Sequence, residues 1–134
     1  MKRPILSIFM ALIAIVAIAA TVTNYAQAEF KTRLHDFGTI KEEKGPVSCT
    51  FEFTNTGDKP LIIIDATASC GCTRPEYSVK PIKPGKKGKI KVTYSPIGRP
   101  GAFRKTIKVN TNGRSTGGRI TLVIEGTVIP AKKK

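Results

Sequence analysis

The sequence predicts an all-β domain, an immunoglobulin-like β-sandwich of about seven strands, behind an N-terminal export signal. Short segments rich in Val, Ile, Phe and Thr alternate with turns rich in Gly, Pro, Asn and Asp. Beyond residue 28, no stretch repeats its apolar residues with the period of a helix. Many short strands with frequent turn signals are typical of a sandwich rather than of a sheet covered by helices.

Residues 1–28 have the three parts of a secretory signal peptide. Lys2 and Arg3 form a short positive region, Ile5–Ala20 is apolar, and Ala26-Gln27-Ala28 is a small-x-small cleavage pattern. We expect cleavage after Ala28 and, in the uncleaved chain, a helix detached from the domain. The alternative is an uncleaved anchor, because the apolar run is slightly long for a signal and slightly short of the roughly 20 residues that span a bilayer.

The remaining chain is expected to form one domain, residues 29–131, with a basic tail at residues 132–134. Lys and Arg outnumber Asp and Glu by 23 to 9 across the whole chain, which gives a net charge of +14. For a protein exported to the periplasm or cell envelope, this charge does not indicate nucleic acid. It indicates a solvated lysine surface or contact with an anionic envelope polymer.

Six segments have the strand pattern most clearly. They are Arg33–Phe37, Val47–Thr54, Leu61–Ala66, Gly88–Tyr94, Phe103–Asn110 and Ile120–Ile129. Leu61–Ala66 is almost continuously apolar, which predicts a strand in the middle of the sandwich. Gly38 is expected to begin a kink, and Gly57 to take a positive φ in a tight turn. The segment from the cysteines to Tyr77 is expected to be a loop.

The tripeptide Cys70-Gly71-Cys72 is the most informative motif, because export would bring its thiols into an oxidising compartment. Together with Cys49 it allows three single disulfides. A Cys70–Cys72 bridge closes a very small ring, whereas Cys49–Cys70 or Cys49–Cys72 would join neighbouring strands if the Cα atoms lie within roughly 7 Å. Alternation along its strand points Cys49 inward, as a small buried apolar residue.

Two functional alternatives stay open for the cysteines. The pair Cys70 and Cys72 can cycle between dithiol and disulfide, with Arg74 favouring the thiolate. The same pair can bind Cu or Zn with Cys49 and His35 as further ligands, although the spacing matches no standard zinc motif. In either case we expect the Cys70/Cys72 segment at one end of the sandwich and partly exposed.

No catalytic arrangement is visible in the sequence. His35 is the only histidine, which disfavours a Ser-His-Asp triad, and the acidic residues are scattered rather than paired. We therefore expect no enzyme and no required cofactor. A further hypothesis concerns the outward-facing basic side chains of two strands, which would form one anion-binding face if the strands are neighbours. These side chains are Lys89, Lys91, Arg104 and Lys108.

Several motifs together resemble a known family. They are Leu34–Ile40, Phe51–Leu61, Ser69–Pro75, Pro81–Gly85 and Gly101–Ile107. This set closely resembles the domain of unknown function 1573 family of exported bacterial proteins, which is similar to Hydin-like and major-sperm-protein-like immunoglobulin folds. The resemblance covers Arg33 to Val128 and implies a seven-stranded sandwich and export, but no reaction.

Within this resemblance, the Cys70/Cys72 pair is a feature of the family, whereas Cys49 is a departure from its pattern. Related domains are mostly binding or assembly modules. The sequence therefore predicts an exported, non-catalytic interaction or scaffolding module of the cell envelope. Its partner would be an unknown envelope protein or an anionic envelope polymer, and it would contact the membrane only through an uncleaved signal segment.

Overall fold

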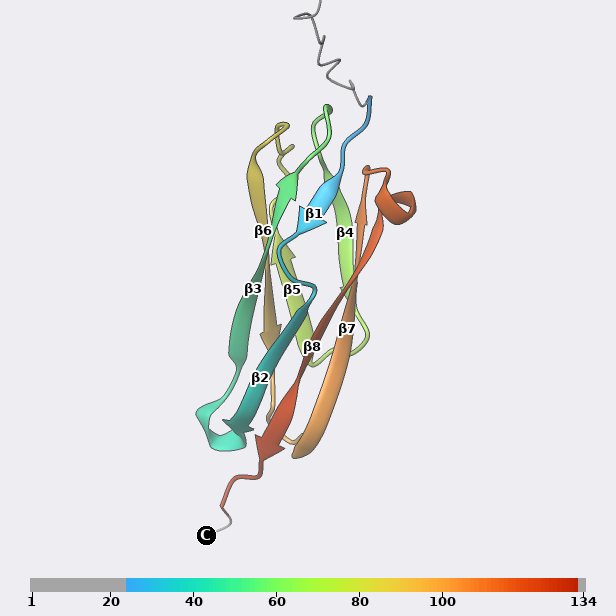
Figure 1. Ribbon diagram of the computed structural model, residues 1–134. Helices are drawn as coiled ribbons and strands as arrows, with labels where there is room; N and C mark the ends of the chain where they lie inside the picture. The colour runs from blue at the N-terminus through green and yellow to red at the C-terminus, as the bar shows by residue number, and fades with distance from the viewer. Residues whose placement is uncertain (1–23, 133–134) are drawn as a thin grey trace, which may run out of the picture.

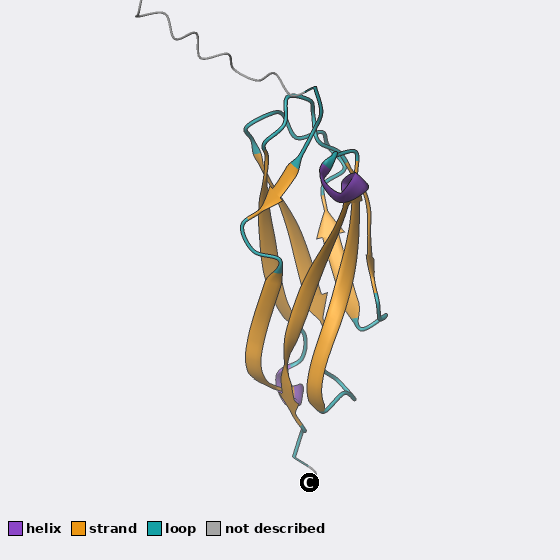
Figure 2. Ribbon diagram, turned by 45° about the vertical axis from the view of Figure 1, so that its right-hand side comes forward, coloured by secondary structure: helices purple, strands orange, loops and turns teal. Residues whose placement is uncertain are grey.

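The structure is a computed structural model that describes residues 24–132, apart from the side chains of residues 115 and 116. Two four-stranded sheets pack face to face in an elongated sandwich (Figure 1). The strands are β1 (Ala28–Phe30), β2 (Leu34–Lys41), β3 (Val47–Asn55), β4 (Ile63–Ala68), β5 (Thr73–Tyr77), β6 (Lys87–Tyr94), β7 (Gly101–Thr111) and β8 (Arg119–Ile129). Single turns of 3-10 helix, Glu42–Lys44 and Ser115–Gly118, lie in two connections (Figure 2).

One sheet has the order β1-β3-β6-β5 and the other has the order β2-β8-β7-β4. All strand pairs are antiparallel except β2 and β8, which run parallel. Because β1 and β2 belong to different sheets, the chain crosses between the sheets at residues 31–33. The connections β3–β4, β5–β6 and β7–β8 gather at one end of the sandwich, where the N-terminal segment also enters (Figure 1).

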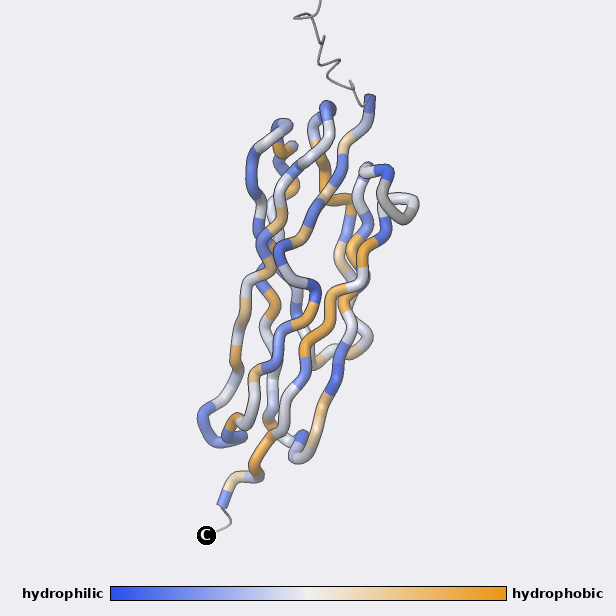
Figure 3. Tube along the Cα trace, in the orientation of Figure 1, coloured by the Kyte–Doolittle hydropathy of each residue, from blue (hydrophilic) through white to orange (hydrophobic). Residues whose placement is uncertain are grey.

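Alternation along the strands builds the core between the sheets. Hydrophobic and hydrophilic residues are interspersed along both sheets in Figure 3. The fully buried large side chains include Phe51, Ile90, Val92, Ile107 and Leu122. Burial of each such side chain contributes roughly 1.5–3 kcal/mol relative to leaving it exposed, so these alternating positions hold the two sheets together.

An aromatic contact joins the sheets near the end that holds the C-terminus. Tyr94 of β6 and Phe103 of β7 stack with ring centroids 4.0 Å apart. Gly126 of β8 pairs with Phe103, and a Cβ atom on Gly126 would lie 2.9 Å from that ring. The glycine therefore leaves the space that the Phe103 ring occupies. On β2, Gly38 has a φ of 67° at a register shift, as expected of a kink.

The all-β sandwich is confirmed, with three differences from the expected strands. β1 is an additional short strand, and Thr73–Tyr77 forms β5 where a loop is expected. The apolar run Leu61–Ala66 predicts a central strand, but β4 lies at a sheet edge. Ile62 and Ile64 alternate with the buried Leu61 and Ile63, so they face outward and are 38% and 60% exposed. An apolar run reports burial on average and does not distinguish edge from centre.

The N-terminal segment also differs from expectation. Residues 1–23 lie outside the described residues, so the expected signal helix is tested only at residues 24–28. These are not helical and are not detached, since Ala26 and Ala28 are buried in the core. Gly57 does not have a positive φ; a Cβ there would overlap the carbonyl oxygen of Tyr25. In the part that the structure describes, no helix is long and apolar enough to cross a membrane.

Candidate functional site

The cysteine motif lies in the turn between β4 and β5, which are edge strands of different sheets. The backbone nitrogen of Ser69 donates to the carbonyl oxygen of Thr106 in the middle of β7 (2.9 Å), and that of Ser95 donates to Cys72 (2.8 Å). The turn therefore sits part-way along the edge of the sandwich, visible to the right of β5 and β7 in Figure 1, and not at one end as predicted.

Cys70 and Cys72 are joined by a disulfide within this turn. Cys72 is buried, whereas Cys70 is half-buried and Gly71 is exposed. The backbone nitrogen of Cys72 donates to Sγ of Cys70 (3.0 Å), and the sulfur of Cys72 lies 3.5 Å from the hydroxyl oxygen of Thr73. Of the three pairings that the sequence leaves open, the structure forms the smallest ring.

Cys49 takes no part in this bridge. It is a free, buried cysteine on β3, paired with Val92 of β6. β6 lies between Cys49 and β5, the strand that begins at Thr73. The alternative disulfides, from Cys49 to Cys70 or to Cys72, therefore do not form. Burial raises the pKa of the Cys49 thiol to about 11, which keeps it protonated at neutral pH. It is therefore an apolar side chain of the core, as its alternation indicates.

The predicted soft-metal set does not assemble. His35 is half-buried on β2, in the sheet that does not contain Cys49, and its ring meets Phe37 edge-on at 4.5 Å. Cys70 and Cys72 use their sulfurs in the disulfide. Within residues 24–132, no three His, Cys, Asp or Glu side chains form a group that could hold a metal ion. His35 thus belongs to the aromatic packing near Phe103.

The predicted anion-binding face does not form as one surface. β6, with Lys89 and Lys91, lies in one sheet, and β7, with Arg104 and Lys108, lies in the other. The exposed side chains of the two strands therefore lie on opposite outer faces of the sandwich. Arg104 forms a salt bridge with Glu125 on β8 (2.7 Å). Lys89 is paired in register with Glu52 of β3. Two of the four basic residues, Arg104 and Lys89, therefore have an acidic neighbour.

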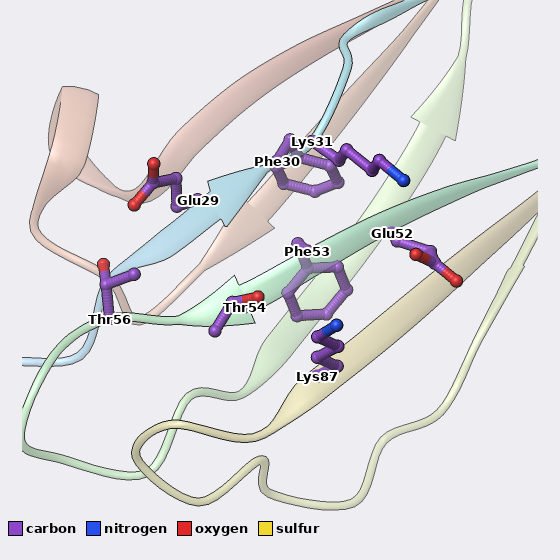
Figure 4. A pocket seen from close by; sticks show the side chains of 8 residues that line it. All are labelled: Glu29, Phe30, Lys31, Glu52, Phe53, Thr54, Thr56 and Lys87. Atoms are coloured by element: carbon purple, nitrogen blue, oxygen red, sulfur yellow. The ribbon is translucent and has the colours of Figure 1, made fainter.

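A shallow pocket of about 470 Å³ lies where β1 meets β3 and the start of β6 (Figure 4). The rings of Phe30 and Phe53 lie side by side there, with centroids 5.0 Å apart. Charged and hydroxyl side chains surround the two rings. These are Glu29, Lys31, Glu52, Thr54, Thr56 and Lys87. Phe53 is only 2% exposed, so the accessible apolar part of the pocket is the half-buried Phe30, with charged groups of both signs and hydroxyl groups around it.

The edge of β3 beside this pocket is only partly covered. β1 pairs with Phe53–Asn55 and ends there, and the backbone nitrogen of Lys31 donates to Glu52 (3.0 Å). Because backbone groups alternate in direction along a strand, Ser48 and Thr50 point the same way as Glu52. On that side, the described part of the chain supplies no strand partner for these two residues. The uncovered stretch is called the open edge of β3 below.

Sequence reasoning identified neither the pocket nor the open edge. The positions of Phe30 and Lys31 were not predicted, because β1 is short and begins at Ala28, inside the predicted cleavage pattern. The alternation of Val47–Thr54 predicted the strand itself, with Phe53 inward. It carries no signal for how far a neighbouring strand extends, since pairing depends on distant parts of the chain.

Comparison with known families matches residues 28–128 to a family described as "Protein of unknown function (DUF1573)". The chain belongs to this family. The match confirms the resemblance drawn from the sequence motifs, and it assigns no reaction. No curated protein matches the chain.

Solved structures share the fold at low sequence identity. A protein of unknown function from Porphyromonas gingivalis W83 matches with a TM-score of 0.68 and 16% identity, over 81% of this chain and 50% of that one. The ASH/PapD-like domain 7 of human CEP192 matches with a TM-score of 0.58 and 13% identity, over 81% and 89%. The secreted serine protease VesC from Vibrio cholerae matches with a TM-score of 0.56 and 12% identity, over 84% and 24%.

The DUF1573 chain thus spans about half of the first of these proteins and about a quarter of the protease. At these identities the matches show the immunoglobulin-like fold alone. A fold of this kind hosts many unrelated functions, so function has to be argued from the site.

Proposed function

We propose that this DUF1573 protein is an exported, non-catalytic interaction module of the cell envelope, which binds an extended peptide segment of an envelope protein. The observation that carries the proposal is the open edge of β3. The N–H and C=O groups of Ser48 and Thr50 point sideways from the edge of the sheet, and the described part of the chain supplies no strand partner for them. An added strand satisfies such groups by main-chain hydrogen bonds, a common mode of peptide recognition.

The pocket beside the open edge supports this mode. A peptide added along β3 would continue the line of β1 and bring its side chains toward Phe30 and the charged side chains around it. Main-chain hydrogen bonds along an edge supply affinity, whereas side-chain pockets supply specificity. Lys31 and Glu52 at the rim offer one partner for each sign of charge. The family description, which names no reaction, agrees with a binding role.

Site-specific photo-cross-linking in intact cells tests the proposal. A photoreactive amino acid is placed at Ser48 or Thr50, and, as a matched position, at Thr121, an exposed threonine of the other sheet. We expect one discrete adduct with an envelope protein from positions 48 and 50 and none from position 121. The same adduct pattern from all three positions, or no adduct from 48 and 50, would exclude binding along the open edge.

A proline variant separates edge binding from ordinary proximity. Thr50→Pro removes an outward-pointing N–H while the hydrogen bonds to β6 stay, because Cys49 and Phe51 point toward β6. Thr50→Val keeps that N–H and is the control. We expect the adduct from position 48 to disappear with Thr50→Pro and to persist with Thr50→Val. The comparison requires that both variants keep the melting temperature of the unmodified domain.

Thiol redox chemistry is the second candidate. It is favoured by the half-buried Cys70, whose Sγ accepts a hydrogen bond from the backbone nitrogen of Cys72. This N–H would stabilise a thiolate at Cys70 after reduction. Intact-mass measurement in the cell envelope under anaerobic and aerobic growth tests it. A change of two hydrogen masses between the two conditions supports cycling, and a disulfide present in both excludes it.

A further inference from the structure

Residues just before the predicted cleavage point are part of the folded domain. The carbonyl oxygens of Tyr25, Ala26 and Gln27 accept backbone hydrogen bonds at the loop end of the sandwich. The donors are the backbone nitrogens of Asp58 (2.8 Å), Arg114 (3.0 Å) and Thr56 (2.9 Å), respectively. Ala26 is 2% exposed and Ala28 is 4% exposed. These contacts disfavour cleavage after Ala28, because cleavage there would remove residues that are packed into the domain.

The domain is shaped around this segment. Asn55 is fully buried, and its side-chain oxygen accepts hydrogen bonds from the backbone nitrogens of Gln27 and Gly57. A Cβ at Gly57 would lie 2.8 Å from Cα of Ala26, and a Cβ at Gly113 would lie 3.3 Å from its oxygen. The β3–β4 and β7–β8 loops, which contact this segment, therefore each have a glycine close to Ala26. Cleavage after Ala28 would remove the acceptors of these backbone N–H groups and uncover the surface that Ala26 and Ala28 bury.

The same end of the sandwich is strongly basic. Its three loops and the adjoining strand ends carry exposed basic side chains, with Asp58 and Glu29 as the neighbouring acidic residues. The basic residues are Lys59, Lys80, Lys83, Lys86, Lys87, Arg114 and Arg119. At the opposite end, the exposed basic residues Lys41, Lys44, Arg99 and Lys132 lie with Glu42 and Glu43. Among the described residues, the excess of basic over acidic side chains is therefore larger around the point where the N-terminal segment enters.

We propose that this end of the sandwich faces the membrane: the chain keeps Tyr25–Ala28, the apolar run Ile5–Ala20 remains as an anchor, and the basic loops contact anionic lipid headgroups. Five Cα-to-Cα steps join Ala20 to Tyr25, a reach of at most about 18 Å. An anchor retained at that distance holds the basic loops at the lipid surface, where each lysine gains from anionic headgroups. Lys2 and Arg3 then remain on the cytoplasmic side.

This inference rests on the export in the proposed function, but not on the open edge of β3, which it leaves accessible on the side of the sandwich. The peptide site and the membrane-facing orientation can therefore be disproved independently. Cross-linking at positions 48 and 50 reports the peptide site, whereas the tests below report only processing and orientation.

The first test is the intact mass of the full chain, purified from the envelope of a bacterium that expresses it. We expect the mass of the uncleaved chain, in a membrane fraction that resists extraction by high salt and by alkaline carbonate. A chain that begins at Glu29, or at any residue after the apolar run, would overturn the proposal.

The second test measures orientation, using the absence of native tryptophan in the chain. The T56W variant places a single tryptophan at the basic end, and I97W places one in the β6–β7 connection, where the native side chain is 58% exposed. The full-length variants are reconstituted in vesicles of phosphatidylglycerol and phosphatidylcholine that contain a headgroup spin-labelled lipid. We expect at least twofold stronger quenching for T56W than for I97W. Equal quenching would overturn the orientation.

A charge variant tests the role of the lysines. Substitution of Lys83, Lys86 and Lys87 by Gln should weaken the quenching of T56W in anionic vesicles and leave it unchanged in vesicles of phosphatidylcholine alone. Substitution of Lys41 and Lys44 by Gln, at the opposite end, is the control and should change neither. Equal effects of the two sets of substitutions would show that the basic loops do not contact the headgroups.

Discussion

Tyr94 and Phe103 stack face to face between the two sheets, with ring centroids 4.0 Å apart and ring planes inclined by 14°. Each ring comes from a different sheet, and both are at most 8% exposed. The contact therefore ties β6 to β7 where no main-chain hydrogen bonds join them. Aromatic pairs of this kind contribute about 0.5–1.5 kcal/mol beyond the area that they bury.

Replacement of Phe103 by alanine should destabilise the domain by about 3–5 kcal/mol, since it removes both the stack and the packing against Gly126. Urea denaturation followed by circular dichroism measures the change. Ile97→Ala, at a side chain 58% exposed, should change the stability by less than about 0.5 kcal/mol. A similar loss in both variants would mean that the stack contributes little.

The four hydrogen bonds of the buried Asn55 side chain join the N-terminal segment to two loops. Its nitrogen donates to the carbonyl oxygens of Lys59 (2.7 Å) and Ile82 (2.9 Å), and its oxygen accepts from Gln27 and Gly57. Asn55→Ala leaves these buried groups unsatisfied and should cost at least about 3 kcal/mol.

The matched control for Asn55 is Asn110→Ala. Asn110 lies in the same fold but makes a single exposed side-chain hydrogen bond, to Asp65 (2.6 Å). We expect it to cost less than about 1 kcal/mol in the same urea experiment. Equal destabilisation by the two alanine variants would contradict the central position of Asn55.

The buried thiol of Cys49 makes stability depend on pH in the alkaline range. Burial raises its pKa from 9.0 to about 11. The unfolded chain therefore loses the thiol proton first as the pH rises through 9. The stability due to the protonated thiol is complete below pH 9 and falls between pH 9 and 11, by at most about 3 kcal/mol.

Cys49→Ala should be less stable than the unmodified chain at pH 8, by about 1 kcal/mol, because the sulfur leaves a small gap. It should lose less stability than the unmodified chain between pH 9 and 11, because it has no thiol to ionise. Urea midpoints at pH 8, 9.5 and 11 give the difference, and titration of lysines and tyrosines cancels between the two chains. Parallel pH profiles would contradict the buried thiol.

The Cys70–Cys72 disulfide should contribute little to stability. It closes a loop with a sequence separation of 2, for which the chain-entropy model gives about 1–2 kcal/mol. The double variant Cys70→Ser, Cys72→Ser should therefore fold and keep the cross-link from position 48. Loss of that cross-link in a folded variant would shift the function toward the cysteine turn.

Local alternation predicted the strands whose two faces have different surroundings. Val47–Thr54 and Ile120–Ile129 correspond to β3 and β8 within one residue at each end. β5 was missed because Pro75 lies within it, and a proline is compatible with an edge strand only. The apolar run Leu61–Ala66, in contrast, contains no information about the edge position of β4.

The cysteine site was predictable in its parts and not in its pairing. Alternation placed Cys49 inward, and the motif marked Cys70 and Cys72 as a pair. Which sulfurs meet depends on the order β3-β6-β5, in which a whole strand separates Cys49 from the others. The contacts of Tyr25–Ala28 were missed for another reason, because a cleavage pattern and a short strand use the same small residues.

The parallel pairing of β2 with β8 has a mechanical consequence. The N-terminal segment enters at one pole of the sandwich, and the C-terminus leaves at the other (Figure 1). A pull on the two ends would draw β2 and β8 in opposite directions along their length, from Leu34–Val123 to Lys41–Ile129. Hydrogen bonds loaded in shear must break together, whereas those of a peeled hairpin break one at a time. A domain built in this way resists tension that is applied along its long axis.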